Sequence, residues 1–511
     1  MTRRQRRTGI ALAASLGLVG LGVGVGVGTS ASAAQAPAPA AHPRAAHVWV
    51  TTPDRAQLLS DDGPLPFSGA AAGQQVQVNE KHTYQVMTGF GAAITDSSAV
   101  DLYRLDPRTR SRLMAELFDP QHGEGLSFLR QPMGASDFVD GKDYTFDDLP
   151  AGQTDYAMRH FSVAHDQRQI LPLLRQAKRL NPQLSVVASP WSPPAWMKTN
   201  DSLVGGKLID DPRIYRAYAL YFVKFIESYQ RAGVPVDFVT LQNEPQNREP
   251  AGYPGMDFPV AQEVRLIDAL GPMLRAAHLR TKILSYDHNW TEHPNDIDTA
   301  KKLGEDPEVN YPYDVLHSDA AKWVAGTAYH CYNGDPTAQT ALHQAFPQKD
   351  IYFTECSGSG STDLAATFSG TLEWHTQHLV IDNLRNWAKS MINWNLALDD
   401  NFGPHLGGCG TCTGVVTVNS DGTIYRNAEY YTLGHLARFV RPGAVRIAST
   451  TGGDTGVQTV AFRNPDRSVA LVAWNADQTA AQTVSVHDDG AAFAYQLPAG
   501  AVATFTWAGR H

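Results

Sequence analysis

The sequence predicts an α/β protein in which a (β/α)8 barrel is joined to an additional antiparallel β-sandwich. Between residues 84 and 440, eight short apolar and β-branched runs alternate with segments of helical periodicity, as expected of βα units around a parallel sheet. After Phe439 the pattern changes to short alternating segments separated by Gly, Asn, Asp and Pro, which is typical of antiparallel strands. Eight βα units are enough to close a barrel, so the tail forms a separate β-domain.

Length and composition agree with one large domain and one small one. The chain has 511 residues, of which 43% are hydrophobic and 18% are charged, a balance that excludes a disordered chain or a coiled coil. Its 43 glycines and 31 prolines follow no fixed period and therefore mark loops. The formal net charge of -9 works against binding to a phosphate backbone, and we expect no nucleic-acid partner.

The N-terminal residues have the layout of a secretory signal. Four arginines precede an apolar run that ends in small residues at 31–33, as at a signal-peptidase site. A membrane anchor is the alternative, but glycine at every second position from residue 20 to 28 makes a poor helix. We predict a signal peptide over 1–33, an Ala/Pro-rich linker over 34–46 and a secreted protein. No later stretch has the roughly eighteen apolar residues that a membrane span needs.

The predicted barrel strands follow one another in a regular order. They lie in runs that begin at Gly89, Leu126, Leu184, Val236, Lys282, Gly326, Ile351 and Met391. The clearest intervening helix starts after an Asp-Pro pair at 211–212 and stops at Gly233, which are ordinary start and stop signals. Residues 47–83 carry short strands like those of the tail. We therefore assign 84–440 to the barrel, and 47–83 together with 441–511 to the β-domain.

The chain contains four cysteines, two of them close together in the sequence. Cys409 and Cys412 stand in GGCGTCTG, where the glycines allow tight closure, and an oxidising destination favours disulfides. We predict a local disulfide between them rather than half of a metal site, because no two further ligands lie nearby. Cys331 and Cys356 are expected to be buried small apolar side chains, and the sequence does not decide whether they pair.

Polar and aromatic residues stand where the predicted strands end. Reacting groups of closed βα barrels gather at the carboxyl ends of the strands, because the loops there form the mouth. The residues at these positions are Asp137, Trp191, Asn243, Glu244, His330, Tyr332, Glu355 and Trp394. Two acids at the ends of apolar strands, Glu244 and Glu355, are costly to bury without partners and indicate a site. Two carboxyl groups that face each other across a sugar are what glycoside cleavage requires.

Other classes of protein fit these residues less well. Each acid alone could form a structural ion pair, and a glycan-binding barrel without activity would keep the aromatic residues and lose the acids, but both acids are present. A metal-dependent hydrolase would need His-x-His on the first strand, which GFGAAITD lacks. A serine hydrolase would need GxSxG, and CSGSGS does not have that spacing. We predict no metal and no cofactor.

An ordered series of motifs resembles glycoside hydrolase family 30, the family of lysosomal-type glucosylceramidases and microbial β-1,6-glucanases. The motifs are GFGAAITDSSA, LRQPMGASDF, ASPWSPPAWMKTN, TLQNEP, AYHCY, FTEC and WNLALDDNFGP, and YYTLGHLARFVRPGAVRI continues the series into the tail. The resemblance implies a TIM barrel and a retaining double displacement. It also implies that Glu244 is the acid/base and Glu355 the nucleophile.

The resemblance implies roles for neighbouring residues as well. Asp137 matches the aspartate that holds the outer hydroxyls of the glycone, and Arg130 matches a buried arginine that supports the nucleophile. Tyr253 matches a tyrosine on the loop after the acid/base. Because side chains alternate along a strand, either His330 and Tyr332 or their neighbours face the mouth, and the family pattern favours these two.

The chemistry of such a pair gives further expectations. The amide of Asn243 can bond the sugar 2-hydroxyl, and Trp191 and Trp394 offer flat apolar faces to the sugar. Retention requires the two carboxyl groups to be only about 5 Å apart, with pKa values pushed in opposite directions. We predict that Glu244 is protonated in the resting enzyme.

The substrate is less constrained, because loops around the mouth depart from the family pattern. Asn393 stands where the family often has Asp, and the cysteine pair lies in the loop after Asn401. An exported protein suits the degradation of a polymer, so we predict a β-glucan, with β-1,6-glucan favoured. A glucosylceramidase-type β-glucosidase stays open, as do a β-xylosidase, a xylanase and a fucosidase. We expect a monomer, and the sequence does not decide between endo and exo cleavage.

Overall fold

The computed structural model describes residues 24, 44–70 and 72–509. Apart from Gly24, the predicted signal peptide over 1–33 lies outside the described residues, as does most of the predicted linker over 34–46. Among the residues that the structure describes, no helix is both long enough and apolar enough to cross a membrane.

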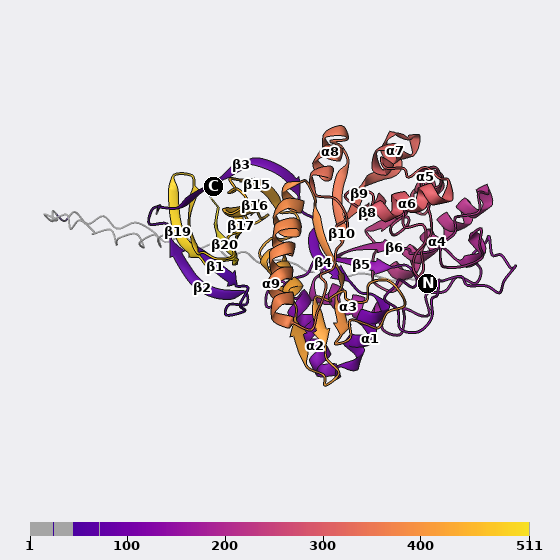
Figure 1. Ribbon diagram of the computed structural model, residues 1–511, viewed down its shortest axis with the longest axis horizontal. Helices are drawn as coiled ribbons and strands as arrows, with labels where there is room; N and C mark the ends of the chain where they lie inside the picture. Colours follow the sequence, from indigo (N-terminus) through magenta and orange to yellow (C-terminus); the bar gives the residue numbers. More distant parts are fainter. Residues whose placement is uncertain (1–23, 25–43, 71, 510–511) are drawn as a thin grey trace. The chain divides into compact units, whose positions relative to one another are not determined.

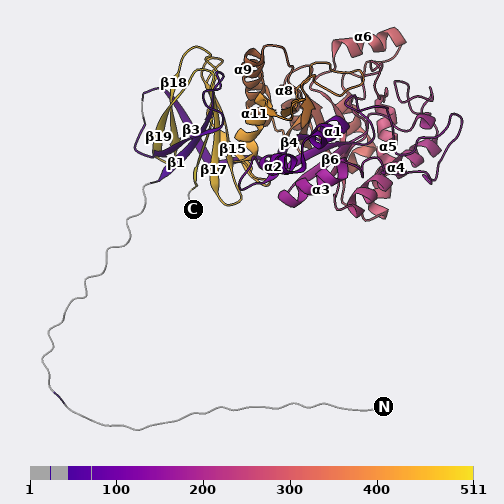
Figure 2. The same ribbon diagram turned by 90° about the horizontal axis from the view of Figure 1, so that it is seen from below.

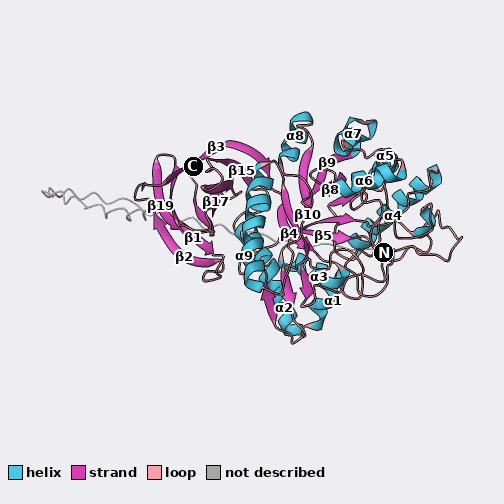
Figure 3. Ribbon diagram, in the orientation of Figure 1, coloured by secondary structure: helices cyan, strands magenta, loops and turns pink. Residues whose placement is uncertain are grey.

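An eight-stranded parallel sheet forms the predicted barrel (Figures 1 and 3). Its strands are β4 (Gly89–Ala93), β5 (Phe128–Pro132), β6 (Ser185–Ser189), β7 (Phe238–Thr240), β8 (Lys282–Asn289), β9 (Val324–His330), β10 (Asp350–Glu355) and β11 (Ser390–Asn395). They are hydrogen-bonded in sequence order, with β11 beside β4. A parallel bridge between Ile351 and Ala388 joins β10 to the chain that enters β11 and closes the ring. Each apolar run identified in the sequence overlaps one of these strands.

Helices surround this sheet (Figure 3). They are α1 (Asp96–Arg104), α2 (Pro107–Phe118), α3 (Ile170–Leu180), α4 (Pro212–Arg231), α5 (Val260–Ala276), α6 (Pro294–Leu303), α7 (Tyr311–His317), α8 (Thr337–Ala345), α9 (Leu364–His375), α10 (Asn383–Arg385) and α11 (Ala428–Ala437), with short 3-10 helices η1 (Ala195–Met197) and η2 (Asp319–Trp323) and a π-helix η3 (Thr376–Asp382). The ends of helix α4 show why its start and stop signals in the sequence predicted its bounds. The side chain of Asp211 caps its first turn by accepting from the backbone N–H of Arg213, and Gly233 follows its end with a φ of 83° that glycine adopts without strain.

The barrel interior is packed with apolar side chains below its mouth. One residue from each of seven strands contributes to this layer, namely Phe128, Val187, Phe238, Leu284, Ala328, Tyr352 and Ile392. Side chains two positions apart on a strand share a face, and on six of these strands the next residue on that face is polar or aromatic: Arg130, Ser189, Thr240, His330, Thr354 and Trp394. On β8 the register shifts after Tyr286. The strand alternation therefore brings Arg130, His330 and Trp394 to the mouth directly above a solid core, whereas Glu355 follows Thr354 at a register shift in β10.

A nine-stranded sheet forms the β-domain and unites the N-terminal strands with the tail (Figure 2). Its strands, in spatial order, are β19 (Ala491–Leu497), β18 (Gln482–Asp488), β3 (Gln74–Val86), β15 (Val445–Ser449), β16 (Val457–Arg463), β17 (Ser468–Asn475), β20 (Val502–Ala508), β1 (Ala45–Thr51) and β2 (Ser60–Pro66). The hydroxyl of Tyr495 on β19 donates to Asp62 on β2 at 2.7 Å. This contact brings the two edge strands together, as in a sandwich.

One pair in this sheet departs from the antiparallel expectation. Strands β3 and β18 run parallel, while every other neighbouring pair in the described sheet is antiparallel. A hairpin forces neighbouring strands to be antiparallel, but β3 and β18 come from opposite ends of the chain, so no hairpin constrains their direction.

Two features within residues 84–440 were not predicted. A three-stranded sheet of β12 (Ala397–Asp399), β13 (Val416–Val418) and β14 (Ile424–Arg426) follows β11. In addition, Cys331 and Cys356 are buried, as expected, and form a disulfide with a Cα–Cα distance of 5.4 Å, which decides the pairing that the sequence left open. The two cysteines directly follow β9 and β10, and the adjacency of these parallel strands places them side by side.

Candidate active site

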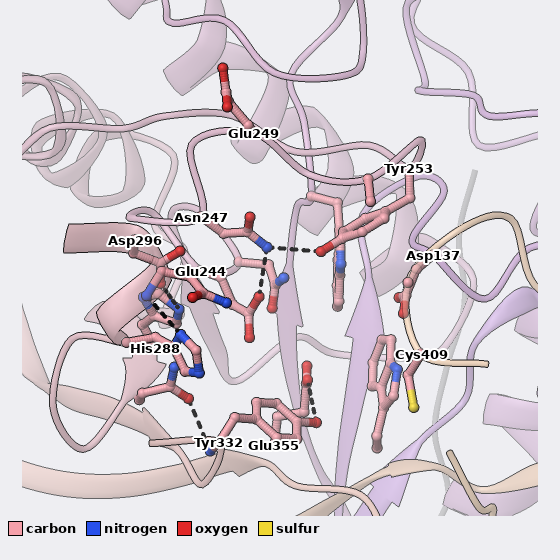
Figure 4. Close-up of a pocket in the computed structure, with 18 of the residues that line it drawn as sticks. Asp137, Glu244, Asn247, Glu249, Tyr253, His288, Asp296, Tyr332, Glu355 and Cys409 are labelled. Atoms are coloured by element: carbon pink, nitrogen blue, oxygen red, sulfur yellow. Dashed lines mark hydrogen bonds and ion pairs between the residues drawn. The ribbon is translucent and has the colours of Figure 1, made fainter. Parts of the chain in front are cut away.

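A cavity of about 510 Å³ opens at the carboxyl ends of the barrel strands. Figure 4 shows many of its side chains. The cavity is lined by ten of the residues singled out in the sequence: Asp137, Trp191, Asn243, Glu244, Tyr253, Tyr332, Glu355, Trp394, Cys409 and Cys412. Arg130 and His330 are fully buried beneath them. The structure thus brings together every predicted site residue.

Glu244 and Glu355 come from different strands and meet at this cavity. Glu355 is the last residue of β10, and Glu244 lies four positions after the end of β7 in a turn with a left-handed φ of 47°. One carboxylate oxygen of each lies within 4.8 Å of the other and of a ring nitrogen of His330. Glycosidases that retain configuration separate their two carboxyl groups by about 5 Å, whereas inverting enzymes leave room for a water between them. This separation suits direct attack by one carboxylate on the anomeric carbon.

Arg130 connects the carboxyl groups to the floor of the site. The guanidinium is completely buried on β5 and forms ion pairs with Glu355 and with Asp287, the latter at 2.7 Å. Its Nη2 also donates to Oδ1 of Asn243 at 2.8 Å. A buried charge is tolerated only when it is paired and hydrogen-bonded. Arg130 therefore fixes the orientation of Glu355 and leaves the amide nitrogen of Asn243 for another partner.

Asp287 on β8 is a functional residue that the sequence reasoning missed. It is completely buried and accepts hydrogen bonds from the side chains of Arg130, Ser189, Thr240, His330 and Thr354. Burial opposes its ionisation, but Arg130 and His330 hold the pKa of Asp287 well below its usual range. An acid near the end of an apolar run is the same signal that identified Glu244 and Glu355, and KILSYDHN carries it.

His330 lies between the acids and changes their charge states. Burial alone would lower the pKa of His330, but the negative charges of Glu355 and Asp287 raise it to about 9. Its Nδ1 faces Oε1 of Glu244 at 3.4 Å, and its Nε2 faces Asp287 at 3.0 Å. The histidine is therefore a cation near neutral pH, held between carboxylates.

The pKa values of the two glutamates move in opposite directions, but not as the sequence suggested. Burial would raise the pKa of Glu244, yet the contact with His330 lowers it to about 2. Burial raises the pKa of Glu355, and the charge of Glu244 adds to that effect. These directions run opposite to the prediction that Glu244 is protonated in the resting enzyme. The ring of His330 lies against the carboxylate of Glu244 and favours its ionised form.

The two tryptophans form one wall of the cavity. Trp191 and Trp394 stack on each other, with ring centroids 4.9 Å apart and an interplanar angle of 20°. The guanidinium of Arg130 lies 4.8 Å and 5.4 Å from their ring centroids. Because each ring covers one face of the other, each has only its other face for a sugar, which differs from the expectation of two separate flat surfaces.

The loop that carries the second disulfide packs against Asp137. Cys409 and Cys412 are bonded, with a Cα–Cα distance of 5.5 Å. Gly408, just before them, has a φ of 63°, and a Cβ added there would lie 2.5 Å from Oδ2 of Asp137. The backbone N–H of Leu406 also donates to the carbonyl of Asp137 at 2.8 Å. Burial and the nearby glutamates raise the pKa of the Asp137 carboxyl well above its usual range.

Two tyrosines make hydrogen bonds at the cavity (Figure 4). The hydroxyl of Tyr332 donates to Oε1 of Glu355 at 2.8 Å. The hydroxyl of Tyr253 accepts from Nδ2 of Asn247 at 2.8 Å, and that nitrogen also lies 3.2 Å from Oε2 of Glu244. Burial raises the pKa of Tyr332 and of Tyr253, so both phenols stay neutral.

The cavity extends beyond Glu244 over residues that the sequence did not indicate. These lining residues are Asn247, Glu249, His288, Asn289, His293, Asn295, Asp296 and Thr299. Several belong to helix α6 or to the turn before it. Only His288 and Asn289 end an apolar strand, β8; the others lie in loops or on α6, where the argument from strand ends could not find them.

Two groups of side chains have a geometry that could hold a metal ion within the part of the chain that the structure describes. Asp147, Asp155 and His160 form one group, and Glu244, His330 and Glu355 form the other. In the second group, the buried guanidinium of Arg130 already pairs with Glu355. A cation placed there would meet both this guanidinium and the charged ring of His330.

Comparisons with known proteins agree with this architecture. Residues 87–440 match the family model described as the glycosyl hydrolase family 30 TIM-barrel domain, and residues 443–505 match the corresponding beta sandwich domain. The chain is 34% identical over 464 residues to an endo-1,6-beta-D-glucanase of Trichoderma harzianum, an alignment that covers 85% of this chain and 88% of that protein. It is 29% identical to the lysosomal acid glucosylceramidase of Mus musculus, over 81% of this chain and 79% of that one. A solved structure described as an endo-beta1,6-glucanase superposes with a TM-score of 0.82 at 34% identity, over 91% of this chain and 100% of that one.

Proposed function

Because the chain belongs to glycosyl hydrolase family 30 and is therefore a glycoside hydrolase, we propose that it hydrolyses β-1,6-linked glucan, with Glu355 as nucleophile and Glu244 as acid/base. The observation that carries the catalytic assignment is the placement of one oxygen of each glutamate within 4.8 Å of the other at the cavity. The substrate rests on the likeness to the fungal and the structurally characterised 1,6-glucanases.

In the first step, an oxygen of Glu355 attacks the anomeric carbon and forms a glucosyl ester as the bond to the leaving oxygen breaks. Nδ1 of His330, which lies 3.4 Å from Oε1 of Glu244, first gives a proton to Glu244. Glu244 passes this proton to the leaving oxygen, so that it ends the step as a carboxylate. Arg130 and Tyr332 hold Glu355 at the cavity from two sides, which orients the nucleophile before the substrate arrives.

In the second step, water replaces the leaving group. Glu244 accepts a proton from the water as its oxygen attacks the anomeric carbon, and the ester bond to Glu355 breaks. The proton on Glu244 then returns to His330, which restores the resting charge state. Two inversions at one carbon give net retention of configuration.

The remaining residues recognise the sugar. The amide nitrogen of Asn243 is directed away from Arg130 and is placed to bond the 2-hydroxyl, a contact that strengthens as positive charge develops on the ring. Asp137, held by the Cys409–Cys412 loop, binds outer hydroxyls of the same sugar. The stacked pair of Trp191 and Trp394 covers its C–H surface.

Incubation of the purified protein with β-1,6-glucan, glucosylceramide and a set of aryl β-glycosides tests the substrate. We expect gluco-oligosaccharides from the β-1,6-glucan, released with retained configuration. Preferred cleavage of glucosylceramide or of a xyloside would contradict the proposed substrate.

Rescue by azide distinguishes the role of Glu244 from that of Glu355. Glu244→Ala is expected to keep activity on aryl glucosides with good leaving groups, because these need no proton, and to gain activity when azide replaces the water. If azide does not restore turnover, Glu244 is not the acid/base.

We also propose that the protein is exported. The signal-like N-terminal sequence and the two disulfides support this, since disulfides persist in oxidising compartments. Recovery from the culture medium of a protein that begins near residue 34 is the expected result. Retention of the full-length chain inside the cells would contradict export.

A further inference from the structure

A second cavity of about 570 Å³ lies next to the catalytic cavity, and Tyr332 lines both. The hydroxyl of Tyr332 donates to Glu355 on the catalytic side. Cys331, which is bonded to Cys356, lines the second cavity beside Tyr332. Tyr332 and the disulfide therefore form a partition between the two cavities.

The far wall of this second cavity is one face of helix α9. Thr367, Gly370, Thr371 and Trp374 line it, and their spacing of three and four residues places them on the same side of the helix. Hydroxyl side chains from the segment after β10, Ser357 and Ser359 among them, add to the lining. The cavity thus combines several hydroxyl groups, which both donate and accept hydrogen bonds, with one large aromatic ring.

Trp374 has the character of a stacking surface. Its side chain is 36% exposed, which is unusual for so large an apolar group. The ring of His378 stacks in parallel on one of its faces, with centroids 4.5 Å apart and an interplanar angle of 9°. The histidine supports the indole, and the exposed part of Trp374 lines the cavity, where an aromatic ring suits the C–H face of a sugar.

His375 adds a buried polar side chain to the lining of the cavity. It lines the cavity yet is only 1% exposed, and neither of its ring nitrogens has a hydrogen-bond partner among the described residues. Burial lowers the pKa of this histidine to about 3, so the ring is neutral and offers one donor and one acceptor. A buried polar group left without a partner costs about 1–3 kcal/mol, so this ring is a destabilising element in the wall of the cavity.

We propose that this cavity is a second sugar-binding subsite, which holds one glucosyl unit of a glucan chain while another unit of the same chain occupies the catalytic cavity. The inference rests on the proposed function, because it assumes a polymeric glucan. A 1,6-linkage contains an additional rotatable bond between the rings, which lets the chain turn around Tyr332. The subsite adds affinity for long substrates and has no part in the chemical step.

Two variants test the subsite from opposite directions. Trp374→Ala removes the stacking ring, whereas Gly370→Leu fills the cavity, at a helical position where an added Cβ meets no atom within 4 Å. Leu364→Ala is the matched control, because Leu364 is an exposed apolar residue of the same helix that does not line the cavity. KM and kcat are measured on β-1,6-gluco-oligosaccharides of increasing length and on an aryl β-glucoside.

We expect both variants to raise KM on the longer oligosaccharides by about tenfold, with kcat preserved and with unchanged kinetics on the aryl glucoside. The control variant should match the unaltered protein on every substrate. An equal loss on long and short substrates, or no loss on either, would overturn the subsite. Thermal unfolding of each variant separates a folding defect, which affects all substrates alike, from the length-dependent loss.

Direct binding gives a second measurement. In Glu355→Gln, which cannot form the ester, oligosaccharides long enough to fill both cavities should bind more tightly than short ones, and Trp374→Ala should abolish that difference. If binding to Glu355→Gln does not depend on length, the cavity holds only water and the proposal is wrong. Failure of the unaltered protein to cleave any β-1,6-glucan contradicts the proposed substrate instead, so the two failures are distinguishable.

Discussion

Nδ1 of His330 lies 3.4 Å from Oε1 of Glu244. The imidazole is completely buried and is held from its other side by Asp287. In the proposed mechanism, this contact places the proton for the leaving group next to the carboxyl group that delivers it. His330 would then act as a positioning residue and a proton reservoir for Glu244, from a position below the cavity lining.

Replacing His330 tests this reservoir. Since the pKa of His330 is raised to about 9, kcat/KM on aryl glucosides should fall as the pH rises through about 9 and the ring loses its proton. His330→Gln should lose roughly 10²-fold or more in kcat, the size of a general acid contribution, and its profile should lack that basic limb. A variant that keeps the same limb would show that another group controls it.

The stability of the protein should decrease as the pH rises. Burial raises the pKa of Asp101 to about 8 and that of Asp166 to about 7, and the acids around His330 raise its pKa to about 9. In each case the folded state keeps a proton that the unfolded chain releases at lower pH. This contribution to stability is complete at pH values below the pKa of the unfolded chain, and it is lost as the pH rises through the pKa of the folded state. Thermal unfolding should give a higher Tm near pH 5 than near pH 9. In Asp101→Asn the Tm should change less with pH, and an unchanged slope would contradict the assignment.

The buried charge of Arg130 should dominate the stability of the site. Arg130→Met removes the guanidinium that pairs with both Asp287 and Glu355, and breaking a buried pair in this way costs about 3–5 kcal/mol. Denaturant unfolding measures the change in the free energy of unfolding. Arg265→Met is the control, because the ion pair of Arg265 with Asp210 is exposed and such pairs contribute about 0–1 kcal/mol. Equal effects of the two substitutions would mean that Asp287 and Glu355 do not depend on Arg130.

The disulfide loop should control sugar binding through Asp137. Gly408→Ala places a Cβ 2.5 Å from the carboxylate of Asp137, at a φ of 63° that side chains rarely adopt, so the carboxylate or the loop must move. We expect KM to rise by about tenfold on every glucoside, long or short. Gly410→Ala should leave KM unchanged, because the nearest atom to an added Cβ there lies 4.0 Å away. If both variants behave alike, Asp137 does not depend on the loop.

The sequence was sufficient for the parts of the fold that depend on local pattern. The eight strands were found because each is a short β-branched run, and Glu244 and Glu355 were found because an acid at the end of such a run is costly to bury. Helix α4 was bounded by its Asp-Pro start and its glycine stop. Each of these signals depends only on residues close together in the sequence, so it can be identified without the structure.

Other features depend on which strands are adjacent. Cys331 and Cys356 pair because β9 and β10 are neighbours. The pKa of Glu244 is low because its carboxylate contacts His330, which comes from a distant part of the sequence. The cavity beside α9 likewise joins residues from two loops and a helix. None of these contacts leaves a periodic or local trace, so only the assembled barrel reveals them.

The assignment of Glu355 as the nucleophile is tested most directly by trapping the ester. A 2-deoxy-2-fluoro-β-glucoside with a good leaving group should inactivate the enzyme, because the fluorine slows both steps while the leaving group keeps formation of the ester faster than its hydrolysis. Digestion and mass spectrometry should then locate one fluoroglucosyl group on the peptide that contains Glu355, and on no other peptide. A label on Glu244 or on any other residue, or inactivation without a label, would contradict the account.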